Sequence, residues 1–389
     1  MEVVLTIAVP SYNMEAHLPK NLPTYCAPGL KGRLEVLVLD NASQDRTGEI
    51  ADGFAARYPG TFRVLHRQSR GYGGSINQAL AEARGKYFRI VDADDWVDTA
   101  ALEALVDRLE GCRADVVQTN YRRVVLSTGE QLPVRFSGVE YGRLYTGFAT
   151  CRENPPCIHS VTYRTGLLRE CGFAMQDGIF FVDEEYVILP FLQVKSLVYY
   201  DLDLYRYLVG NPAQSTSPAN RARYAGHREQ VVRRLVEAWR TGQAAGPARD
   251  YYFFRTAQAA GDHLTTLYLY LPDRRAGLRA GRAWERYLKA QAPEIWRAVA
   301  KKGFLLRHLG DEAMVVAIGE ASKSFNGMIR LNETGAFYWK ELEQGATPEE
   351  LVAKTLERYE GVDAETARRD VQAFLESIEV ALESDGADH

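Results

Sequence analysis

The chain has 389 residues, of which 46% are apolar and 25% are charged, a balance typical of a globular protein with two or three folding units. No apolar run approaches the roughly eighteen residues of a membrane span, and the N-terminus lacks the basic region and cleavage site of a secretory signal. The five cysteines form no CxxC pair, which argues against a disulfide framework or a structural zinc site and favours reduced thiols. We therefore expect a cytoplasmic protein without a transmembrane segment.

The net charge of −4 conceals a segregation of charge along the chain. Residues 221–308 contain 18 Lys and Arg against 7 Asp and Glu, whereas residues 346–389 contain 12 acidic against 4 basic residues. The basic stretch could be a solvated face, or it could bind an acidic peptide, a lipid diphosphate or a membrane surface. The acidic end opposes contact with the phosphates of nucleic acids, so we expect no nucleic-acid partner.

The first 125 residues alternate short apolar runs with amphipathic segments. Helices are predicted over residues 73–85 and 98–111, where apolar residues recur at helical spacing. Strands buried on both faces and alternating with helices imply an α/β fold with a mainly parallel sheet. The apolar runs that predict strands, rich in Val, Ile, Leu and aromatic residues, lie at 3–9, 34–40, 62–66, 87–92 and 114–121.

Polar motifs follow three of these strands, namely PSYN at 10–13, DNASQD at 40–45 and DADD at 92–95. Each motif alone could be an ordinary turn or helix cap. Ligands of parallel sheets bind beyond the carboxyl ends of the strands, so three polar clusters at one edge favour a binding site.

A dinucleotide-binding fold is the obvious rival, but it requires GxGxxG directly after the first strand, where this chain has PSYNME. The glycine-rich stretch GYGGSINQ at 71–78 fits neither that spacing nor a phosphate-binding P-loop. Its glycines either allow a ligand to approach the backbone closely or form a tight turn before the helix.

Three carboxylates, Asp92, Asp94 and Asp95, crowd into four positions at the end of the strand at 87–92. Such oxygen ligands suit a hard divalent cation, Mg²⁺ or Mn²⁺, which commonly bridges to substrate phosphates. A cation there would relieve the repulsion between the carboxylates and would neutralise charge on a departing nucleoside diphosphate.

Taken together, the motifs resemble one enzyme family. AVPSYNMEAHL, LEVLVLDNASQDRT, GYGGSINQALAEARGKYFRIVDADDW and FFVDEEYVILPFLQVKSLVYYDLDLYRYLVGNPAQS occur in the order typical of family-2 glycosyltransferases with the GT-A fold. The resemblance covers residues 1–220. It implies a hexosyltransferase that uses a nucleotide-sugar, usually a UDP-sugar, together with Mg²⁺ or Mn²⁺.

The resemblance also implies roles for individual residues. Asp92 and Asp94 would bind the ribose, the diphosphate and the metal, with Asp95 as a further metal candidate. Asn41 stands where many members of the family have Asp. The residues that would bind the nucleotide are Pro10, Ser11, Tyr12, Asp40, Asn41 and Asp92, with the Asp40–Asn41 pair reading the base.

In FFVDEEY the family places its catalytic base, for which Asp183 is the first candidate and Glu184 and Glu185 are the alternatives. The reaction would invert the sugar carbon in a single displacement while the base takes the acceptor's proton, assistance typically worth about 10²- to 10⁴-fold. Without the resemblance, these acids would be interpreted as an ordinary acidic helix start. The block similar to the family's closing loop contains Tyr205, Arg206, Gln214 and Ser215.

Helices are predicted over 221–308, and a small α+β region follows them. In that region we predict strands at 313–318 and 327–331 and helices from about 333, 347 and 364. Thr347 and Glu350 form a capping-box start for the second of these helices.

The stretch MIRLNETGAFYWKELEQGATPEELV, within residues 310–382, resembles PqqD-like domains. These winged-helix-like domains are recognition elements for the leader peptides of ribosomally made, modified peptides, and they bind the leader as an added strand at a sheet edge. By this resemblance, the strand at Met314–Ile318 would receive the leader and the helix at Arg368–Phe374 would form the other wall of the groove. A DNA-binding winged helix is the competing interpretation, which the acidic charge opposes.

We therefore expect a GT-A glycosyltransferase domain at 1–220, a basic helical region at 221–308 and a PqqD-like leader-binding domain at 309–389. The favoured hypothesis is transfer of a sugar from a UDP-sugar to a Ser, Thr or Cys side chain of a precursor peptide held by the last domain. A second hypothesis keeps the chemistry but directs the sugar to a cell-surface polysaccharide or lipid-linked acceptor. The third is a catalytically silent peptide-binding scaffold.

Overall fold

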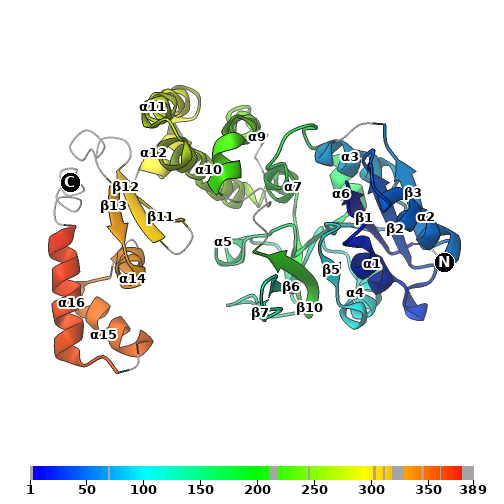
Figure 1. The fold of residues 1–389 in the computed structure, drawn as a ribbon, viewed down its shortest axis with the longest axis horizontal. Coiled ribbons are helices and arrows are strands. Elements are labelled where there is room, and N and C mark those ends of the chain that lie inside the picture. Colours follow the sequence, from blue (N-terminus) through cyan, green and yellow to red (C-terminus); the bar gives the residue numbers. More distant parts are fainter. Residues whose placement is uncertain are drawn as a thin grey trace. The chain divides into compact units, whose positions relative to one another are not determined.

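The computed structural model describes residues 3–68, 71–210, 218–243, 246–300, 304–309, 312–317, 328–342, 346–359 and 361–378 (Figure 1). The chain divides into two compact units. Unit 1 consists of Met1–Asn220 and Tyr224–Ala259, and unit 2 consists of Arg221–Arg223 and Ala260–His389. Gln214, Ser215 and Ile318 lie outside the described residues.

Unit 1 is built on a sheet whose first strands run parallel in the order β3-β2-β1-β4. All residues of β1, β2 and β4 are buried, which explains why these strands have nearly continuous apolar sequences. The predicted α/β fold with a mainly parallel sheet is confirmed. These strands are β1 (Leu5–Ser11), β2 (Leu34–Asp40), β3 (Phe62–His66) and β4 (Tyr87–Ile90).

Helices α2 (Thr47–Arg57), α3 (Tyr72–Glu82) and α4 (Thr99–Gly111) lie between strands along the chain, as the periodicity predicts for the last two. The side chain of Asp98 caps α4 by accepting a hydrogen bond from the Ala101 N–H at 2.9 Å. The apolar face of α4 is fully buried in the same core as β1 and β2, and its buried residues are Leu102, Leu105, Val106 and Leu109.

Beyond β4 the sheet continues with β6 (Val116–Val125), which overlaps the strand predicted at 114–121, and with strands that no sequence motif predicts. β9 (Val161–Arg164) inserts antiparallel between β4 and β6, and β10 (Leu197–Val209) runs parallel to β6. The residues that precede β9, and part of β10, therefore lie close to the residues that follow β4. Smaller strands of this sheet are β5 (Trp96–Val97), β7 (Gln131–Val134) and β8 (Leu144–Tyr145).

Short helical segments fill the connections of unit 1. One of them, α7 (Asp183–Ile188), carries the acidic motif VDEE. The others include α1 (Leu18–Asn21), η1 (Leu22–Tyr25), η2 (Pro28–Leu30), α5 (Thr150–Glu153), α6 (Thr165–Glu170) and η3 (Leu189–Leu192).

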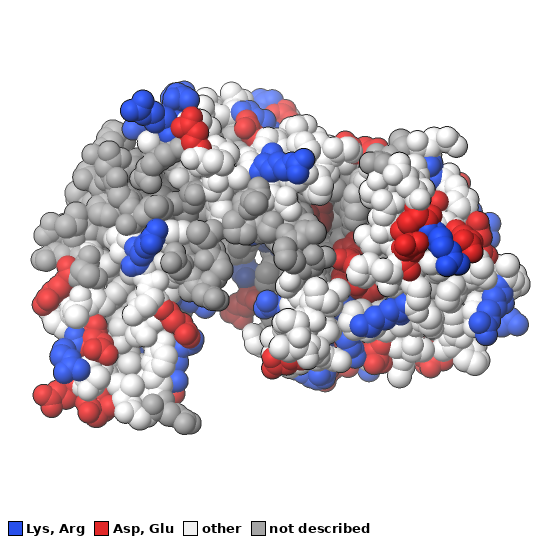
Figure 2. Space-filling view, viewed as in Figure 1, with Lys and Arg blue, Asp and Glu red and all other residues white. Residues whose placement is uncertain are grey.

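The basic middle region is helical as far as Ala300, as predicted, but residues 304–308 belong to a strand of the C-terminal sheet, so the predicted helical range of 221–308 is too long. The first long helix of this region forms ion pairs within unit 1. α9 (Ala225–Arg240) forms ion pairs with α7 through Arg228 and Arg234, which contact Glu184 and Glu185. On the face drawn in Figure 2, basic and acidic side chains of the described residues are interspersed over unit 1. The other helices of this region are α8 (Pro218–Arg223), α10 (Arg249–Thr265), the π-helical turn η4 (Thr266–Tyr270), α11 (Arg274–Gln291) and α12 (Pro293–Ala300).

The C-terminal part of unit 2 is a small α+β fold, as predicted. An antiparallel sheet precedes helices whose apolar faces share one core, which includes Val315, Tyr338, Leu351 and Phe374. The predicted capping box is present, because the Thr347 hydroxyl accepts from the Glu350 N–H while the Glu350 carboxylate accepts from the Thr347 N–H. The elements are β11 (Phe304–Leu309), β12 (Glu312–Ala317), β13 (Met328–Leu331), α14 (Glu333–Leu342), α15 (Pro348–Arg358) and α16 (Ala364–Ser377).

The position of β12 corrects one expectation. β12 contains Met314, but it is the central strand of the sheet and pairs with β11 on one side and β13 on the other. Both of its hydrogen-bonding edges are therefore occupied, and the expectation that an added peptide strand pairs with Met314–Ile318 is wrong. The edge strands among those described are β11 and β13.

Two further expectations concern membrane-spanning segments and the state of the cysteines. In the described parts of the chain, no helix combines the length and the apolar character that a membrane crossing requires. All five cysteines are free thiols.

Candidate active site

The polar motifs after β1, β2 and β4 converge at one edge of the sheet. Ser11 is the register partner of Asp40, and the Asn41 N–H donates to the Ser11 carbonyl oxygen at 2.8 Å. On the other side of β1, the Val91 N–H donates to the Ala8 carbonyl oxygen at 3.0 Å, so the DADD motif begins at the same edge. The fold thus brings the predicted nucleotide and metal residues together.

The PSYN motif contributes mainly backbone to this edge. Pro10 and Ser11 are buried, and the Ser11 hydroxyl donates to the Val9 carbonyl oxygen at 3.2 Å. Tyr12, the next residue, is half-buried.

Asp40 is buried and ionised at the end of β2. Its Oδ1 accepts from the Ser43 N–H at 3.1 Å, and its Oδ2 lies 3.0 Å from Nδ1 of His66. Burial opposes ionisation, but the hydrogen bonds from Ser43 and His66 outweigh it and lower the pKa of Asp40. The same contact with Asp40 raises the pKa of His66 above 6.5.

Asn41 is held by a polar network from the next loop. Its Oδ1 accepts hydrogen bonds from the Arg67 guanidinium at 3.1 Å and from the Ser75 hydroxyl. Arg67 also donates to the Gly71 carbonyl oxygen at 2.7 Å, which ties the glycine-rich turn to β2.

Asp95, a predicted metal ligand, is engaged inside the protein. It is 2% exposed and accepts hydrogen bonds from the Tyr205 hydroxyl and the Leu208 N–H, both at 2.7 Å. Burial first, and then the charges of Asp94 and Asp92, raise its pKa well above the usual range. Asp95 thus anchors the DADD loop to β10, and each of its carboxylate oxygens accepts a hydrogen bond from that strand.

Asp92 is hydrogen-bonded to two tyrosines and lies near other acidic residues. Its Oδ1 accepts from the Tyr72 hydroxyl at 2.8 Å, and its N–H donates to the Tyr205 oxygen at 3.1 Å. Burial raises the pKa of Asp92 to about 7, and the charges of Asp94 and Asp183 act in the same direction. Tyr72 belongs to the glycine-rich turn, which contacts Gln176 and Asp177 before the VDEE motif.

Asp92 and Asp94, which we call the acid cluster, are suited to bind a divalent cation. Among the described residues, neither Asp92 nor Asp94 forms an ion pair with a Lys or Arg, so their crowded charge has no protein counterion. Both side chains are half-buried and thus reachable from solvent. Carboxylate oxygens in this arrangement are the ligands that Mg²⁺ and Mn²⁺ prefer.

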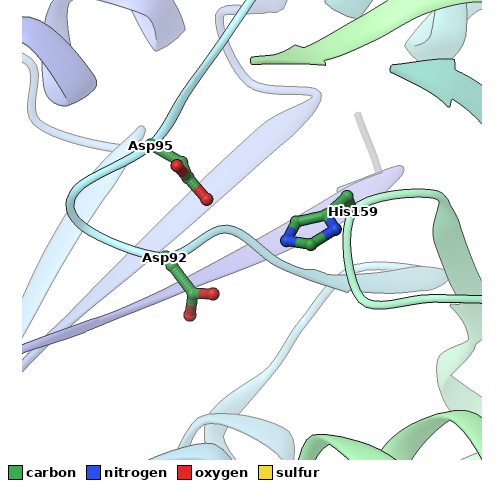
Figure 3. A group of neighbouring side chains, drawn as sticks. All are labelled: Asp92, Asp95 and His159. Atoms are coloured by element: carbon green, nitrogen blue, oxygen red, sulfur yellow. The ribbon is translucent and has the colours of Figure 1, made fainter. Parts of the chain in front are cut away.

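His159 is a neighbour of this cluster that sequence reasoning missed. One ligand atom from each of Asp92, Asp95 and His159 lies within 4.8 Å of the others, and Asp94 does not belong to this group (Figure 3). The ring stacks on Tyr207 with centroids 3.8 Å apart, and burial lowers its pKa to about 3, so the imidazole is neutral. A lone His in the sequence CIHS has no spacing that indicates a site.

The position of His159 depends on a charged residue inside the sheet. Arg89 of β4 is fully buried, and its guanidinium donates to the His159 carbonyl oxygen and to the Thr162 hydroxyl, the latter at 2.9 Å. This residue therefore fixes the segment before β9 against the strand that leads into DADD.

The three acids of VDEE differ in their environments. Glu184 pairs with Arg228, whereas Glu185 is fully buried, accepts two hydrogen bonds from Gln176 at 2.8 and 2.7 Å and pairs with Arg234 at 2.9 Å. Asp183 is exposed and has no ion pair among the described residues. Crowding by protein atoms raises the pKa of Asp183, against the opposing charge of Arg228. Asp183 is thus the acid best placed to face a substrate.

The glycine-rich turn at 71–74 lies very close to Gln176 and Asp177. A Cβ on Gly71, Gly73 or Gly74 would lie 2.0, 1.9 or 2.4 Å from atoms of Gln176 or Asp177. The Gly74 N–H donates to Asp177 at 2.8 Å, next to this contact. The turn that carries Tyr72 is therefore packed against Gln176 and Asp177. Gln176 is in turn hydrogen-bonded to Glu185 of α7, so this segment leads directly into that helix. Sequence reasoning left open whether these glycines approach a ligand or form a turn.

Two family models match the chain. Residues 6–171 match glycosyl transferase family 2, and residues 312–380 match coenzyme PQQ synthesis protein D (PqqD). The chain therefore carries a family-2 glycosyltransferase domain fused to a PqqD-like domain.

Curated relatives match only the N-terminal part. The uncharacterized glycosyltransferase EpsJ of Bacillus subtilis (strain 168) is 31% identical over 114 residues, which are 29% of this chain and 33% of that protein. Glycosyltransferase GlyG of Streptococcus pneumoniae serotype 4 is 31% identical over 122 residues, 31% of this chain and 40% of that protein. The chain thus spans less than half the length of the curated relatives it matches.

A solved structure supports the fold. S. aureus TarS 1-349, in complex with UDP-GlcNAc, aligns over 82% of this chain and 98% of that one, with a TM-score of 0.51 and 16% sequence identity. Together with the strand order and the family match, this likeness establishes the GT-A fold.

Proposed function

We propose that this chain is a metal-dependent inverting glycosyltransferase that moves a hexose from a UDP-sugar to a Ser, Thr or Cys side chain of a ribosomal precursor peptide. The observation that carries the proposal is that Tyr72, which is hydrogen-bonded to Asp92, lies in a turn packed against the segment that leads into α7 and Asp183. This arrangement occurs in a family-2 domain of a chain that also carries a PqqD-like domain. A silent scaffold would not need the DADD and VDEE motifs to be held together.

The donor would bind across the ends of β1, β2 and β4. The ionised Asp40 and the restrained Asn41 are suited to hydrogen bonds with a base, and the backbone at Ser11 and Tyr12 lies beside them. The S. aureus TarS structure holds UDP-GlcNAc, which agrees with a UDP-sugar as donor here.

Asp92 and Asp94 would hold Mg²⁺ or Mn²⁺, and Asp95 would support their loop from behind. The cation supplies positive charge that stabilises the departing diphosphate. Tyr72 would fix the Asp92 carboxylate through its hydrogen bond.

Asp183 would act as the base that takes the acceptor's proton, because its carboxylate is exposed beside the acid cluster. Crowding raises its pKa, which makes the carboxylate a better proton acceptor than an isolated Asp. Glu184 and Glu185 would hold α7 against α9 through their arginine partners.

The PqqD-like domain, at 309–389, would bind the precursor's leader by strand addition. β13 pairs with β12 alone among the described strands, and its Leu331 shares a core with Val371 and Phe374 of α16. The outer edge of β13 is therefore the position that we propose for the leader strand, in place of the β12 edge. Holding the leader would raise the concentration of the peptide's core segment at the catalytic site.

We propose a cytoplasmic location, where peptide precursors and nucleotide-sugars meet. The five free thiols agree with a reducing compartment.

The test is donor turnover by the full-length chain. Wild-type protein should bind UDP-glucose or UDP-GlcNAc and release UDP only when Mg²⁺ or Mn²⁺ is present. Asp94→Ala should lose both properties, whereas Asp183→Asn should keep donor binding and lose UDP release in the presence of an acceptor. Asp107→Asn, an exposed acid remote in sequence from the site motifs, is the matched control. Equal UDP release by wild type and Asp94→Ala would refute the assignment.

A further inference from the structure

An exposed cluster of rings lies directly before the proposed base. Phe180 is 42% exposed, and its ring stacks on Tyr224 with centroids 4.1 Å apart and planes 27° apart. His227 is nearly parallel to Phe180, with centroids 6.0 Å apart and planes 13° apart. We call Phe180, Tyr224 and His227 the aromatic platform.

The backbone holds the platform in a defined position. The Phe180 N–H donates to Nδ1 of His227 at 3.2 Å, so in the neutral ring the proton lies on Nε2. Phe181 has φ of +67°, a left-handed conformation that is uncommon for a bulky residue and recurs at functional sites. The exposed ring of Phe180 is therefore fixed by specific contacts.

The platform adjoins the VDEE motif from two directions. Phe180 lies three residues before Asp183, and Tyr224 and His227 lie at the start of α9. Arg228, the residue after His227, pairs with Glu184, and its guanidinium lies 5.7 Å from the Phe181 ring. The first turn of α9 thus contacts both the platform segment and the acids of α7.

We propose that the aromatic platform is an acceptor subsite that binds a ring-bearing side chain, aromatic or proline, next to the modified residue of the peptide. This inference rests on the proposed function, since the presence of the PqqD-like domain is what favours a peptide over a saccharide. Stacked rings favour a planar, apolar partner. The Nε2–H of His227 supplies a donor for a carbonyl oxygen of the bound peptide.

The test uses full-length protein with UDP and Mn²⁺ and three N-acetylated hexapeptides, in which one serine is preceded by Trp, Pro or Ala. Binding is measured by saturation-transfer NMR and calorimetry. The Trp and Pro peptides should bind about 3- to 10-fold more tightly than the Ala peptide, the range expected for one aromatic contact. Phe180→Ala should abolish this preference, and Phe180→Tyr should retain it.

Leu132→Ala is the matched control, because Leu132 is 39% exposed and lies on β7. It should keep the preference, and all variants should bind UDP equally. A loss of UDP binding in Phe180→Ala, or no preference in wild type, would overturn the subsite. Phe180-dependent binding of maltotriose or chitotriose without peptide binding would also overturn it, because the platform would then serve a saccharide.

Failure of this inference and failure of the proposed function give different results. Transfer to peptides that ignores both the neighbouring residue and Phe180 would overturn the subsite alone. Phe180-dependent binding of the Trp peptide, with no transfer even to a leader-bearing precursor, would refute the proposed function and leave the aromatic platform as a ring-binding surface alone.

Discussion

Gly73→Ala tests whether the glycine-rich turn exists to let the segment before α7 approach. A Cβ at position 73 would lie 1.9 Å from the Gln176 carbonyl oxygen, whereas real Cβ atoms keep at least 3.0 Å. The two segments must therefore separate by about 1 Å, and the obstacle is backbone that cannot rotate away. Overpacking of this kind costs about 1–3 kcal/mol. Alanine in a helix gains about 0.5–1 kcal/mol over glycine, so we expect a net loss of about 1–2 kcal/mol.

Gly53→Ala is the matched control, because Gly53 lies in α2 and a Cβ there would meet no atom within 4 Å. It should raise the stability of the protein by about 0.5–1 kcal/mol. Urea unfolding followed by circular dichroism compares the two variants with wild type. If both substitutions shift the midpoint in the same direction by the same amount, the reasoning about the turn is wrong.

The same substitution should affect both turnover and donor binding. The displaced segment contains Gln176, which is hydrogen-bonded to Glu185 of α7, and Tyr72 of the turn and the following Ser75 are hydrogen-bonded to Asp92 and Asn41. We therefore expect Gly73→Ala to lower kcat and to raise the Kd for UDP, measured by calorimetry.

Three further substitutions or titrations test the surrounding contacts. Asp95→Ala removes the carboxylate that accepts from the buried Tyr205 hydroxyl and from the Leu208 N–H, and it should cost about 1–3 kcal/mol in urea unfolding. Asp94→Ala should stay within about 0.5 kcal/mol of wild type. Arg234→Ala removes the partner of the fully buried glutamate of α7 and should cost at least about 1 kcal/mol more than Arg233→Ala, whose exposed pair is worth about 0.5 kcal/mol or less. Carboxylates face both ring nitrogens of His66, so its NMR titration should give a pKa above 6.5. The stability from this pairing is present below pH 6.5 and lost as the pH rises through the raised pKa; a midpoint at or below 6.5 would contradict the geometry.

The strands that carry the motifs could be predicted because their signal is local. Residues 34–40 and 62–66 form β2 and β3 with the predicted bounds, and 87–92 contains β4. Their apolar runs and the polar residues at their ends lie within a few positions of one another, so periodicity and topology rules suffice.

The rest could not be predicted because it depends on pairing between distant segments. β9 enters the sheet between β4 and β6, and no local pattern states this order. The same holds for β12, since its sequence is compatible with either an edge or a central strand. The hydrogen bonds of Asp95 to β10 and the position of His159 beside Asp92 follow from contacts that only the fold provides.

The glycine-rich turn is a further feature that the sequence predicts only in part. The sequence leaves open whether these glycines allow the close approach of a ligand or form a tight turn before the helix. The identity of the neighbour, a backbone carbonyl of the segment before α7, depends on a contact across about one hundred residues.

The most direct test of the central claim is hexose transfer to a precursor peptide by the full-length chain. The substrates are a candidate precursor peptide, with and without its leader, together with UDP-glucose or UDP-GlcNAc and Mn²⁺. The products are analysed by intact mass and fragmentation. We predict one added sugar on a Ser, Thr or Cys of the leader-bearing peptide, much slower transfer to the leaderless peptide and none with Asp183→Asn. Equal transfer to both peptides, or unchanged transfer by Asp183→Asn, would contradict the account.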